Sequence, residues 1–268
     1  PFSFTGRAND IYPQDGILPL KARDALFIRT NNRANGVYLR GFCPQDQQDK
    51  VHVVYNGLTL GRHPLSLAPF MPEYRLLSIG RFVPKKGFAD LLTAVARLRR
   101  ENVPVRLTLV GDGRLRGALK RQCRRLGISD IVDMPGFLPH DRVQALMRSH
   151  DIFIMPSVQT ENGDRDGIPN VIMEALSSRM PVVATDVCGI GEVIHDGETG
   201  LLVPQRDPRA LAEGVRRLLA DREAALRMAG HGRDLVLHMF DSEANTRQLL
   251  HLYRDSCAHA GRESALNA

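Results

Sequence analysis

The chain has 268 residues, of which 43% are hydrophobic, and it carries a formal net charge of +6 with a pI near 9.4. This length allows one large domain or two small ones, and the composition suffices for a hydrophobic core. No stretch approaches the roughly 20 apolar residues that span a bilayer, and four widely spaced cysteines favour reduced thiols in a cytoplasmic protein over a metal-bound or disulfide-linked scaffold.

The first part of the chain predicts three strands before a boundary. The strand-like runs are Phe2–Thr5, Ala25–Thr30 and Val51–Val54. An Asn-Gly pair at 56–57 and the proline-rich stretch Pro64–Pro72 follow, as is typical of a domain end and a linker. We therefore assign 1–60 to an N-terminal domain and 61–73 to the linker. Because domains commonly have roughly 100–200 residues, this first domain is expected to be partial.

From residue 74 onward, strand-like and helical runs alternate regularly, which is typical of a parallel sheet covered by helices. The sequence predicts one complete Rossmann-like α/β domain over 74–240, then a helix over 241–256 and a tail over 257–268. The expected strands are Arg75–Ile79, Val105–Val110, Ile131–Met134, Asp151–Met155, Pro181–Ala184 and Gly200–Val203. The expected helices are Phe88–Arg100, Leu115–Leu126, Arg142–Ser149, Val171–Ser178, Pro208–Leu219, Glu223–Leu237 and Ser242–Arg254.

The positive charge is carried mostly by arginine. Six Lys or Arg residues lie between Arg114 and Arg125, and Arg97, Arg99 and Arg100 form a second cluster. One interpretation is a set of solvated helix faces. The other is attraction to the anionic inner face of a membrane or to an anionic lipid-linked acceptor. Nucleic acid is not expected as a partner, because no aromatic residues interleave these charges.

Two cations follow the first strand of the Rossmann-like domain. Arg81 comes directly after the strand and Gly80, and Lys86 precedes a glycine at the start of the next helix. The carboxyl ends of strands in open α/β sheets are where ligands bind. Arg81 offers a planar fork for two oxygens, and Lys86 a compact charge. The pattern therefore favours an anionic ligand such as a nucleoside diphosphate.

Two carboxylates flank a predicted helix start in the segment D-G-I-P-N-V-I-M-E, from Asp166 to Glu174. Gly167 and Pro169 bracket the turn, and proline suits a helix's first turn because its missing N–H would be unpaired there. The apolar residues after Ile168 share one helical face, whereas Glu174 lies on the opposite, polar side. A helix N-terminus offers free N–H groups to an anion.

Five segments occur in the order and spacing of the family-4 retaining glycosyltransferases, which the chain resembles from its start to about Tyr253. They are S-I-G-R-F-V-P-K-K-G, L-V-G-D-G, M-P-G-F-L-P, D-G-I-P-N-V-I-M-E-A and G-E-T-G-L-L-V-P. The resemblance implies a GT-B architecture, in which two Rossmann-like domains face each other and the second mainly holds the nucleotide sugar. It also implies a last helix that braces the first domain, and a chain truncated at its N-terminus.

The resemblance implies a role for each matching residue. Arg81 and Lys86 match the diphosphate-binding pair, and Glu174 matches the carboxylate that holds the nucleotide ribose. Asp166 matches the first of two paired glutamates, which faces the donor sugar, but it is one methylene shorter. Arg7 stands where the family has a histidine facing that sugar, and an arginine that is always protonated cannot act as a base.

Further donor contacts are expected from backbone and base-framing positions, namely Gly80, Gly167, Ile168, Phe137 and Leu138. For Phe137 and Leu138, simple packing is an equal alternative. The turn Gly189–Glu192 is either a phosphate-facing turn or a tight corner. His140, His150 and His195 are isolated from other metal ligands, so no metal and no cofactor is expected.

The sequence thus predicts a glycosyltransferase that moves a hexosyl unit from a nucleoside diphosphate sugar to a glycan or lipid-linked acceptor hydroxyl with retention. Two alternatives remain open. Arg7 and Asp166 favour a non-catalytic module that only binds the donor. A dinucleotide-dependent oxidoreductase would need a strand followed by G-x-G-x-x-G and a later acidic residue, and no segment supplies that pattern.

Overall fold

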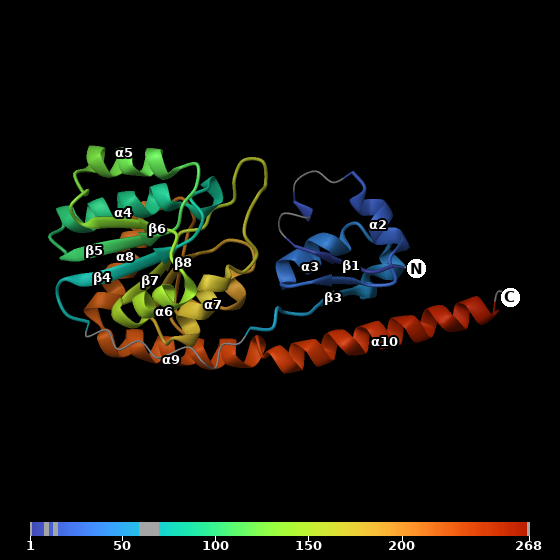
Figure 1. The fold of residues 1–268 in the computed structure, drawn as a ribbon. Coiled ribbons are helices and arrows are strands. Elements are labelled where there is room, and N and C mark those ends of the chain that lie inside the picture. The colour runs from blue at the N-terminus through green and yellow to red at the C-terminus, as the bar shows by residue number, and fades with distance from the viewer. Residues whose placement is uncertain (1, 8–10, 13–15, 59–69, 267–268) are drawn as a thin grey trace.

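A computed structural model describes residues 2–7, 11–12, 16–58 and 70–266. It contains two separate parallel sheets, with helices packed around each (Figure 1). The predicted linker at 61–73 falls largely on residues 59–69, which lie outside the described part of the chain.

The N-terminal region is built on three parallel strands in the order β1-β2-β3. These are β1 (Phe4–Gly6), β2 (Ile28–Thr30) and β3 (Val51–Val53), with helices α2 (Leu18–Asp24) and α3 (Arg33–Arg40) and the 3-10 helix η1 (Gln45–Lys50) between them. Ile28, Leu18 and Leu39 join one small buried cluster. The three predicted strands are confirmed within a few residues.

The larger domain has six parallel strands in the order β6-β5-β4-β7-β8-β9. Each predicted strand is found, and Val105–Val110 matches without change. Strands β7 and β8 are buried along their whole length, as expected for central strands covered on both faces. The strands are β4 (Tyr74–Ile79), β5 (Val105–Val110), β6 (Val132–Gly136), β7 (Ile152–Met155), β8 (Val182–Thr185) and β9 (Leu201–Val203).

Helices cover both faces of this sheet and divide its core into two clusters. The helices are α4 (Phe88–Arg100), α5 (Arg116–Leu126), α6 (His140–Ser149), α7 (Asn170–Ser177), α8 (Pro208–Ala220) and α9 (Arg222–Met239). Leu92 of α4, Leu119 of α5 and Val215 of α8 belong to the first cluster. Met147 of α6 and Ile172 of α7 belong to the second, on the other face. The prediction of a complete Rossmann-like domain is therefore confirmed.

The last helix, α10 (Ser242–Leu266), runs beside the N-terminal region (Figure 1). The ring of Tyr253 packs edge-on against Phe27 with centroids 5.0 Å apart. The backbone N–H of Leu58 also donates to the carbonyl of Phe240 at 3.0 Å, just before α10 begins. The helix thus extends through most of 257–268, where the sequence analysis expected a tail. None of the described helices is both long and apolar enough to cross a membrane.

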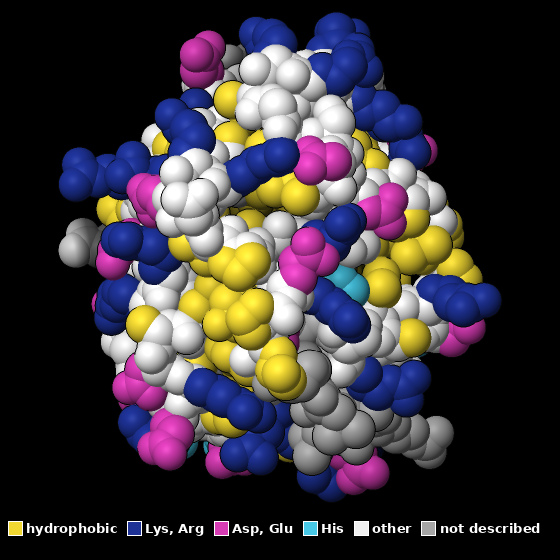
Figure 2. Space-filling view, turned by 90° about the vertical axis from the view of Figure 1, so that its left-hand side faces the viewer, with side chains coloured by type: hydrophobic (Ala, Val, Ile, Leu, Met, Phe, Trp, Pro, Cys, Tyr) yellow, Lys and Arg dark blue, Asp and Glu magenta, His cyan; other side chains and the backbone are white. Residues whose placement is uncertain are grey.

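The domain face turned away from the N-terminal region shows Lys and Arg side chains spread among Asp and Glu (Figure 2). Among the described residues of the larger domain, several arginines form ion pairs: Arg97 with Glu101 at 2.8 Å, Arg99 with Asp130, and Arg106 with Glu73. Of the two interpretations of the positive charge, a solvated helix face is therefore favoured for Arg97, Arg99 and Arg100 at the end of α4. Four cations of α5, from Lys120 to Arg125, are exposed.

Candidate functional site

Two cavities open at the carboxyl ends of the larger sheet's strands, and Arg81 lines both. The first, here called the apolar cavity, has a volume of about 390 Å³ and lies between the ends of β4 and β5 and the helices α6 and α7. It brings together five of the predicted donor-binding residues: Gly80, Arg81, Phe137, Leu138 and Glu174. Phe137 is 83% exposed, so a ligand there would cover an otherwise solvated ring.

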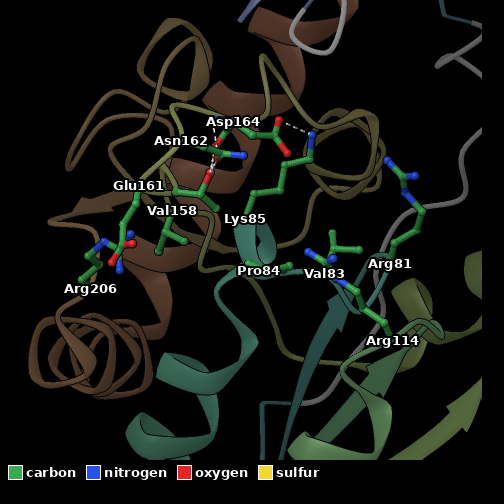
Figure 3. Close-up of a pocket in the computed structure, with 11 residues that line it drawn as sticks. Arg81, Val83, Pro84, Lys85, Arg114, Val158, Glu161, Asn162, Asp164 and Arg206 are labelled. Atoms are coloured by element: carbon green, nitrogen blue, oxygen red, sulfur yellow. Dashed lines mark hydrogen bonds and ion pairs between the residues drawn. The ribbon is translucent and has the colours of Figure 1, made fainter. Parts of the chain in front are cut away.

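The second, here called the basic groove, has a volume of about 560 Å³. Figure 3 shows Arg81 and Arg114 on one side of it, Arg206 and Glu161 on the other, and Val83 and Pro84 below. It is lined by Arg81, Val83, Pro84, Lys85, Arg114, Val158, Thr160, Glu161, Asn162, Asp164 and Arg206. Lys86 and Asp166 are not among these lining residues.

Glycines allow the loops to approach closely at this edge of the sheet. Gly111 has φ +136°, and a Cβ there would lie 1.9 Å from the carbonyl oxygen of Gly80. Gly87 has φ +64°, and a Cβ there would lie 1.8 Å from the carbonyl oxygen of Pro156. Both positions therefore require glycine. They hold the loops after β4, β5 and β7 together and so place Arg81 beside the end of β5.

Both lysines before Gly87 are buried and form ion pairs with the loop that leads into α7. Lys86, which is 9% exposed, lies 2.7 Å from Asp166, and Lys85, which is 4% exposed, lies 2.9 Å from Asp164 and 3.7 Å from Asp166. The sequence analysis singled out Lys86 alone. In the structure Lys85 also has a role, because its ion pairs with Asp164 and Asp166 hold the 160–166 loop near the strand ends.

Glu174 faces the apolar cavity from α7 and is partly buried. Burial raises the pKa of its carboxyl above the usual range, while the proximity of His140 acts in the opposite, smaller direction. No described residue forms an ion pair with it. A carboxylate that is desolvated without a partner inside the protein is a candidate for binding a ligand's hydroxyl groups.

The N-terminal region contacts the larger domain through Glu192, in the turn after β8. Its carboxylate accepts from the backbone N–H of Arg33 at 2.8 Å, from that of Ala34 at 3.3 Å, and from the Tyr55 hydroxyl at 2.7 Å. Burial, with the Glu192 carboxylate as a further cause, raises the pKa of Tyr55. Of the two interpretations of Gly189–Glu192, the tight corner is favoured, with its glutamate bonded across to α3.

A second contact between the two regions surrounds Tyr12. Its hydroxyl donates to Asn35 Oδ1 at 2.5 Å and lies 3.5 Å from Cys188 Sγ. The Arg165 guanidinium lies 3.7 Å above the Tyr12 ring centroid. Because Arg165 precedes Asp166, this cation–π contact links the loop before α7 to the N-terminal region.

Residues 66–235, more than half of the chain, match the family model described as Glycosyl transferases group 1. The chain belongs to this family. Among curated relatives, it is 32% identical over 213 residues to WcaL of Salmonella typhimurium, a glycosyltransferase named for colanic acid biosynthesis; that match covers 78% of this chain and 52% of the relative.

Other relatives extend this comparison. The chain is 32% identical over 180 residues to the alpha-D-kanosaminyltransferase of Streptomyces kanamyceticus, covering 67% of this chain and 45% of that protein. It spans about half the length of these curated relatives. Among solved structures, Anabaena HepE in complex with UDP and glucose matches with a TM-score of 0.81 at 21% identity, covering 95% of this chain and 71% of that chain. This likeness confirms the GT-B fold.

The remaining predicted site residues lie outside the two cavities. Asp166 is held by the lysines, and Gly167 lies so close to Asn32 that a Cβ would come within 2.5 Å of Asn32 Nδ2. Ile168 packs its side chain into the core beside α7, which leaves only its backbone for a ligand. Arg7 is exposed at the end of β1 and near enough to Arg29 to lower that residue's pKa, after the larger effect of burial.

Sequence reasoning missed Arg114 and Arg206 as members of a site, and it missed the contact of Glu192 with the N-terminal region. The G-D-G-R and V-P-Q-R segments each place an arginine just after a strand end, and that position was the available signal for the first two. Glu192 had no such signal, because its partners lie 159 and 137 residues away along the chain. Among the described residues, no group of three or more His, Cys, Asp or Glu side chains is placed to hold a metal.

Proposed function

We propose that this chain binds a nucleoside diphosphate sugar and takes part in the transfer of its hexosyl unit to an acceptor hydroxyl. The transfer proceeds with retention at the anomeric carbon and belongs to polysaccharide or glycolipid synthesis. The observation that carries the proposal is the convergence of Arg81, Glu174, Phe137 and Leu138 on one apolar cavity at the carboxyl edge of the sheet. An apolar cavity with a few polar groups at its rim is the usual form of a small-molecule site.

Each part of the donor has a counterpart in this cavity and beside it. The base lies against Phe137 and Leu138 next to Gly80, and Glu174 accepts from the ribose hydroxyls. Arg81 and Lys86 hold the diphosphate. The sugar extends toward Asp166 and the backbone of Gly167 and Ile168. Family membership and the named relatives support this assignment, since the HepE structure contains UDP and glucose.

The chemistry follows from where charge develops. When the bond between the sugar's anomeric carbon and the diphosphate breaks, negative charge grows on the diphosphate oxygens. Two fixed cations, Arg81 and Lys86, can stabilise that charge in the transition state, so the proposal includes neither a metal nor a cofactor. Lys86 lies 2.7 Å from Asp166, and the bound diphosphate therefore shares Lys86 with this carboxylate.

The acceptor in this proposal is a glycan or a lipid-linked sugar, reached from the cytoplasm or at the inner face of the membrane. Exposed cations of α5, such as Lys120 and Arg124, would support a peripheral contact with anionic lipids. WcaL is named for colanic acid biosynthesis, which agrees with a polysaccharide or glycolipid product. Nucleic acid is not proposed as a partner.

A second candidate function is donor binding without turnover. It is favoured by the ion pair that holds Asp166 to Lys86 and by the arginine at position 7. An assay of sugar transfer and donor hydrolysis, run beside a measurement of nucleotide binding, separates the two. Binding without turnover supports this second candidate.

The donor assignment is tested by calorimetry with UDP and GDP. Arg81→Ala and Lys86→Ala should each weaken binding by about 1.5–3 kcal/mol, the typical value of a hydrogen bond to a charged group. Arg121→Ala removes an exposed arginine of α5 and should leave the affinity unchanged. Because Lys86 is buried, the free energy of unfolding of its variant is measured as well. Equal nucleotide affinity in the parent and both site variants would remove the diphosphate assignment.

A further inference from the structure

The basic groove is a second binding surface beside the proposed donor site. Its volume of about 560 Å³ lies within the roughly 300–1,000 Å³ of small-molecule sites. It shares Arg81 with the apolar cavity, whereas Arg114 and Arg206 line the groove without lining that cavity. A ligand there would lie next to the donor without occupying the donor's place.

The cationic side chains of the groove differ in whether they already have partners within the protein. Lys85 is held by Asp164 at 2.9 Å, and one N–H of Arg206 donates to the Gln159 carbonyl at 2.6 Å. Within the described part of the chain, the guanidinium groups of Arg81 and Arg114 have no hydrogen-bond or ion-pair partner. Two neighbouring planar cations suit a carboxylate or a phosphate, each of which can accept two parallel hydrogen bonds from an arginine.

The opposite side of the groove has a different chemistry. There, Glu161 and Asn162 are exposed on the loop that follows β7, and Arg206 lies on the same side (Figure 3). A carboxylate and an amide are hydrogen-bonding partners for hydroxyl groups. The loop itself is braced, because Asn162 Oδ1 accepts from the Thr160 hydroxyl at 2.6 Å and Asp164 is fixed by Lys85. The groove therefore offers cations at one end and hydroxyl-binding groups at the other.

We propose that the basic groove binds an acidic sugar of the acceptor, with its carboxylate or phosphate at Arg114, beside Arg81, and its hydroxyls toward Glu161 and Asn162. This inference rests on the proposed function, because the groove is useful to a transferase only beside a bound donor. It makes Arg114 and Arg206 determinants of acceptor specificity and assigns them no part in donor binding.

The test uses the full chain with UDP at saturating concentration, so that Arg81 and Lys86 are already engaged by the nucleotide. Glucuronate and glucose 1-phosphate are titrated separately, with glucose as the neutral probe, and binding is followed by backbone amide shifts in NMR spectra. We expect saturable shifts in the 160–164 loop and at Arg206, and at least about 10-fold weaker binding of glucose, which corresponds to 1.4 kcal/mol. A response to glucuronate alone indicates a uronic acid, and to glucose 1-phosphate alone a sugar phosphate.

The double variant Arg114→Ala/Arg206→Ala should weaken binding of the acidic probe by about 10-fold or more. The matched control is Arg121→Ala/Arg125→Ala, which removes the same charge from the exposed face of α5 and should leave probe binding unchanged. UDP affinity should be equal in all forms. Equal probe affinity in the groove variant and the parent, equal weakening by both double variants, or no saturable binding of either acidic probe overturns the proposal. Failure of UDP to bind the parent counts separately, against the proposed function.

Discussion

Two short helices, α3 and α7, begin close to each other, since Gly167 before α7 lies against Asn32 at the start of α3. The backbone N–H groups of their first turns differ in whether the protein supplies their hydrogen-bond acceptors. Both have eight residues. In α3, Asn32 accepts from the N–H of Asn35 at 2.7 Å, and Glu192 from the larger domain accepts from the N–H groups of Arg33 and Ala34. The amide donors of its first turn are therefore used within the protein.

Helix α7 begins after Pro169, which offers no side-chain cap, and its first turn has no acidic residue. The nearest preceding carboxylate, Asp166, forms an ion pair with Lys86 instead. A helix start whose amides are not capped by the chain suits an anionic ligand, whereas one that is fully capped contributes to stability. The difference indicates that α3 joins the two regions and that α7 belongs to the proposed donor site.

The largest effect should come from removing the carboxylate that caps α3. Glu192→Ala deprives two amides and the Tyr55 hydroxyl of their acceptor, and we expect it to lower the free energy of unfolding by about 3 kcal/mol, at the upper end for charged hydrogen bonds. The measurement is chemical denaturation. Glu198→Ala, an exposed carboxylate in a neighbouring turn, is the matched control. Equal stability of the two variants would show that the contact across the two regions contributes little.

A smaller effect is expected from restoring the usual residues around the proposed donor sugar. Asp166→Glu lengthens the carboxylate by one methylene, and a misplacement near 1 Å can cost about 10²-fold in rate. We expect this variant to raise turnover rather than donor affinity, Arg7→His to raise it as well, and the two together to exceed either alone. Sugar transfer or donor hydrolysis is measured for the parent, both single variants and the double variant. A parent that turns over as fast as the restored forms would mean that Arg7 and Asp166 are working substitutions.

The parts of this structure that the sequence predicted depend on short-range patterns. Apolar runs located the strands of both sheets. Arg81 and Glu174, both singled out from the sequence, line one cavity because strand ends of a parallel sheet share one edge. Helices α2 and α3 were missed. The segment of α3 contains Asn and Gly, both poor helix formers, and its start depends on Glu192 from a distant part of the chain. Such long-range contacts leave no periodic signal in the sequence.

The burial of Lys85 was missed for a related reason. A lysine that follows a proline in a loop is typical of an exposed cation, and the burial of Lys85 here depends on Asp164. That carboxylate lies in the loop after β7, and strand order brings the loop beside the end of β4. The order of strands, which the sequence analysis did not predict, thus decides which loops form the basic groove.

The smallest effect concerns Glu174 and sharpens the assignment of α7 to the donor. Since burial raises the pKa of this carboxyl, the folded state binds its proton more tightly than the unfolded state does. The charged form therefore opposes folding at pH values above the raised pKa, and this penalty disappears as the pH falls below the unfolded value. Glu174→Gln should accordingly be no less stable than the parent at neutral pH, with any gain lost in acid.

Nucleotide affinity should respond in the opposite sense to stability. The ionised carboxylate accepts from ribose hydroxyls, so Glu174→Gln should weaken UDP or GDP binding by about 1.5 kcal/mol, and acidification should weaken binding by the parent but not by the variant. Calorimetry across the acidic range and denaturation of the same samples provide both quantities. Loss of stability with unchanged nucleotide affinity would make Glu174 a structural residue. Loss of affinity with retained stability, set against the opposite expectation for Glu192→Ala, would separate the ligand-binding helix start from the structural one.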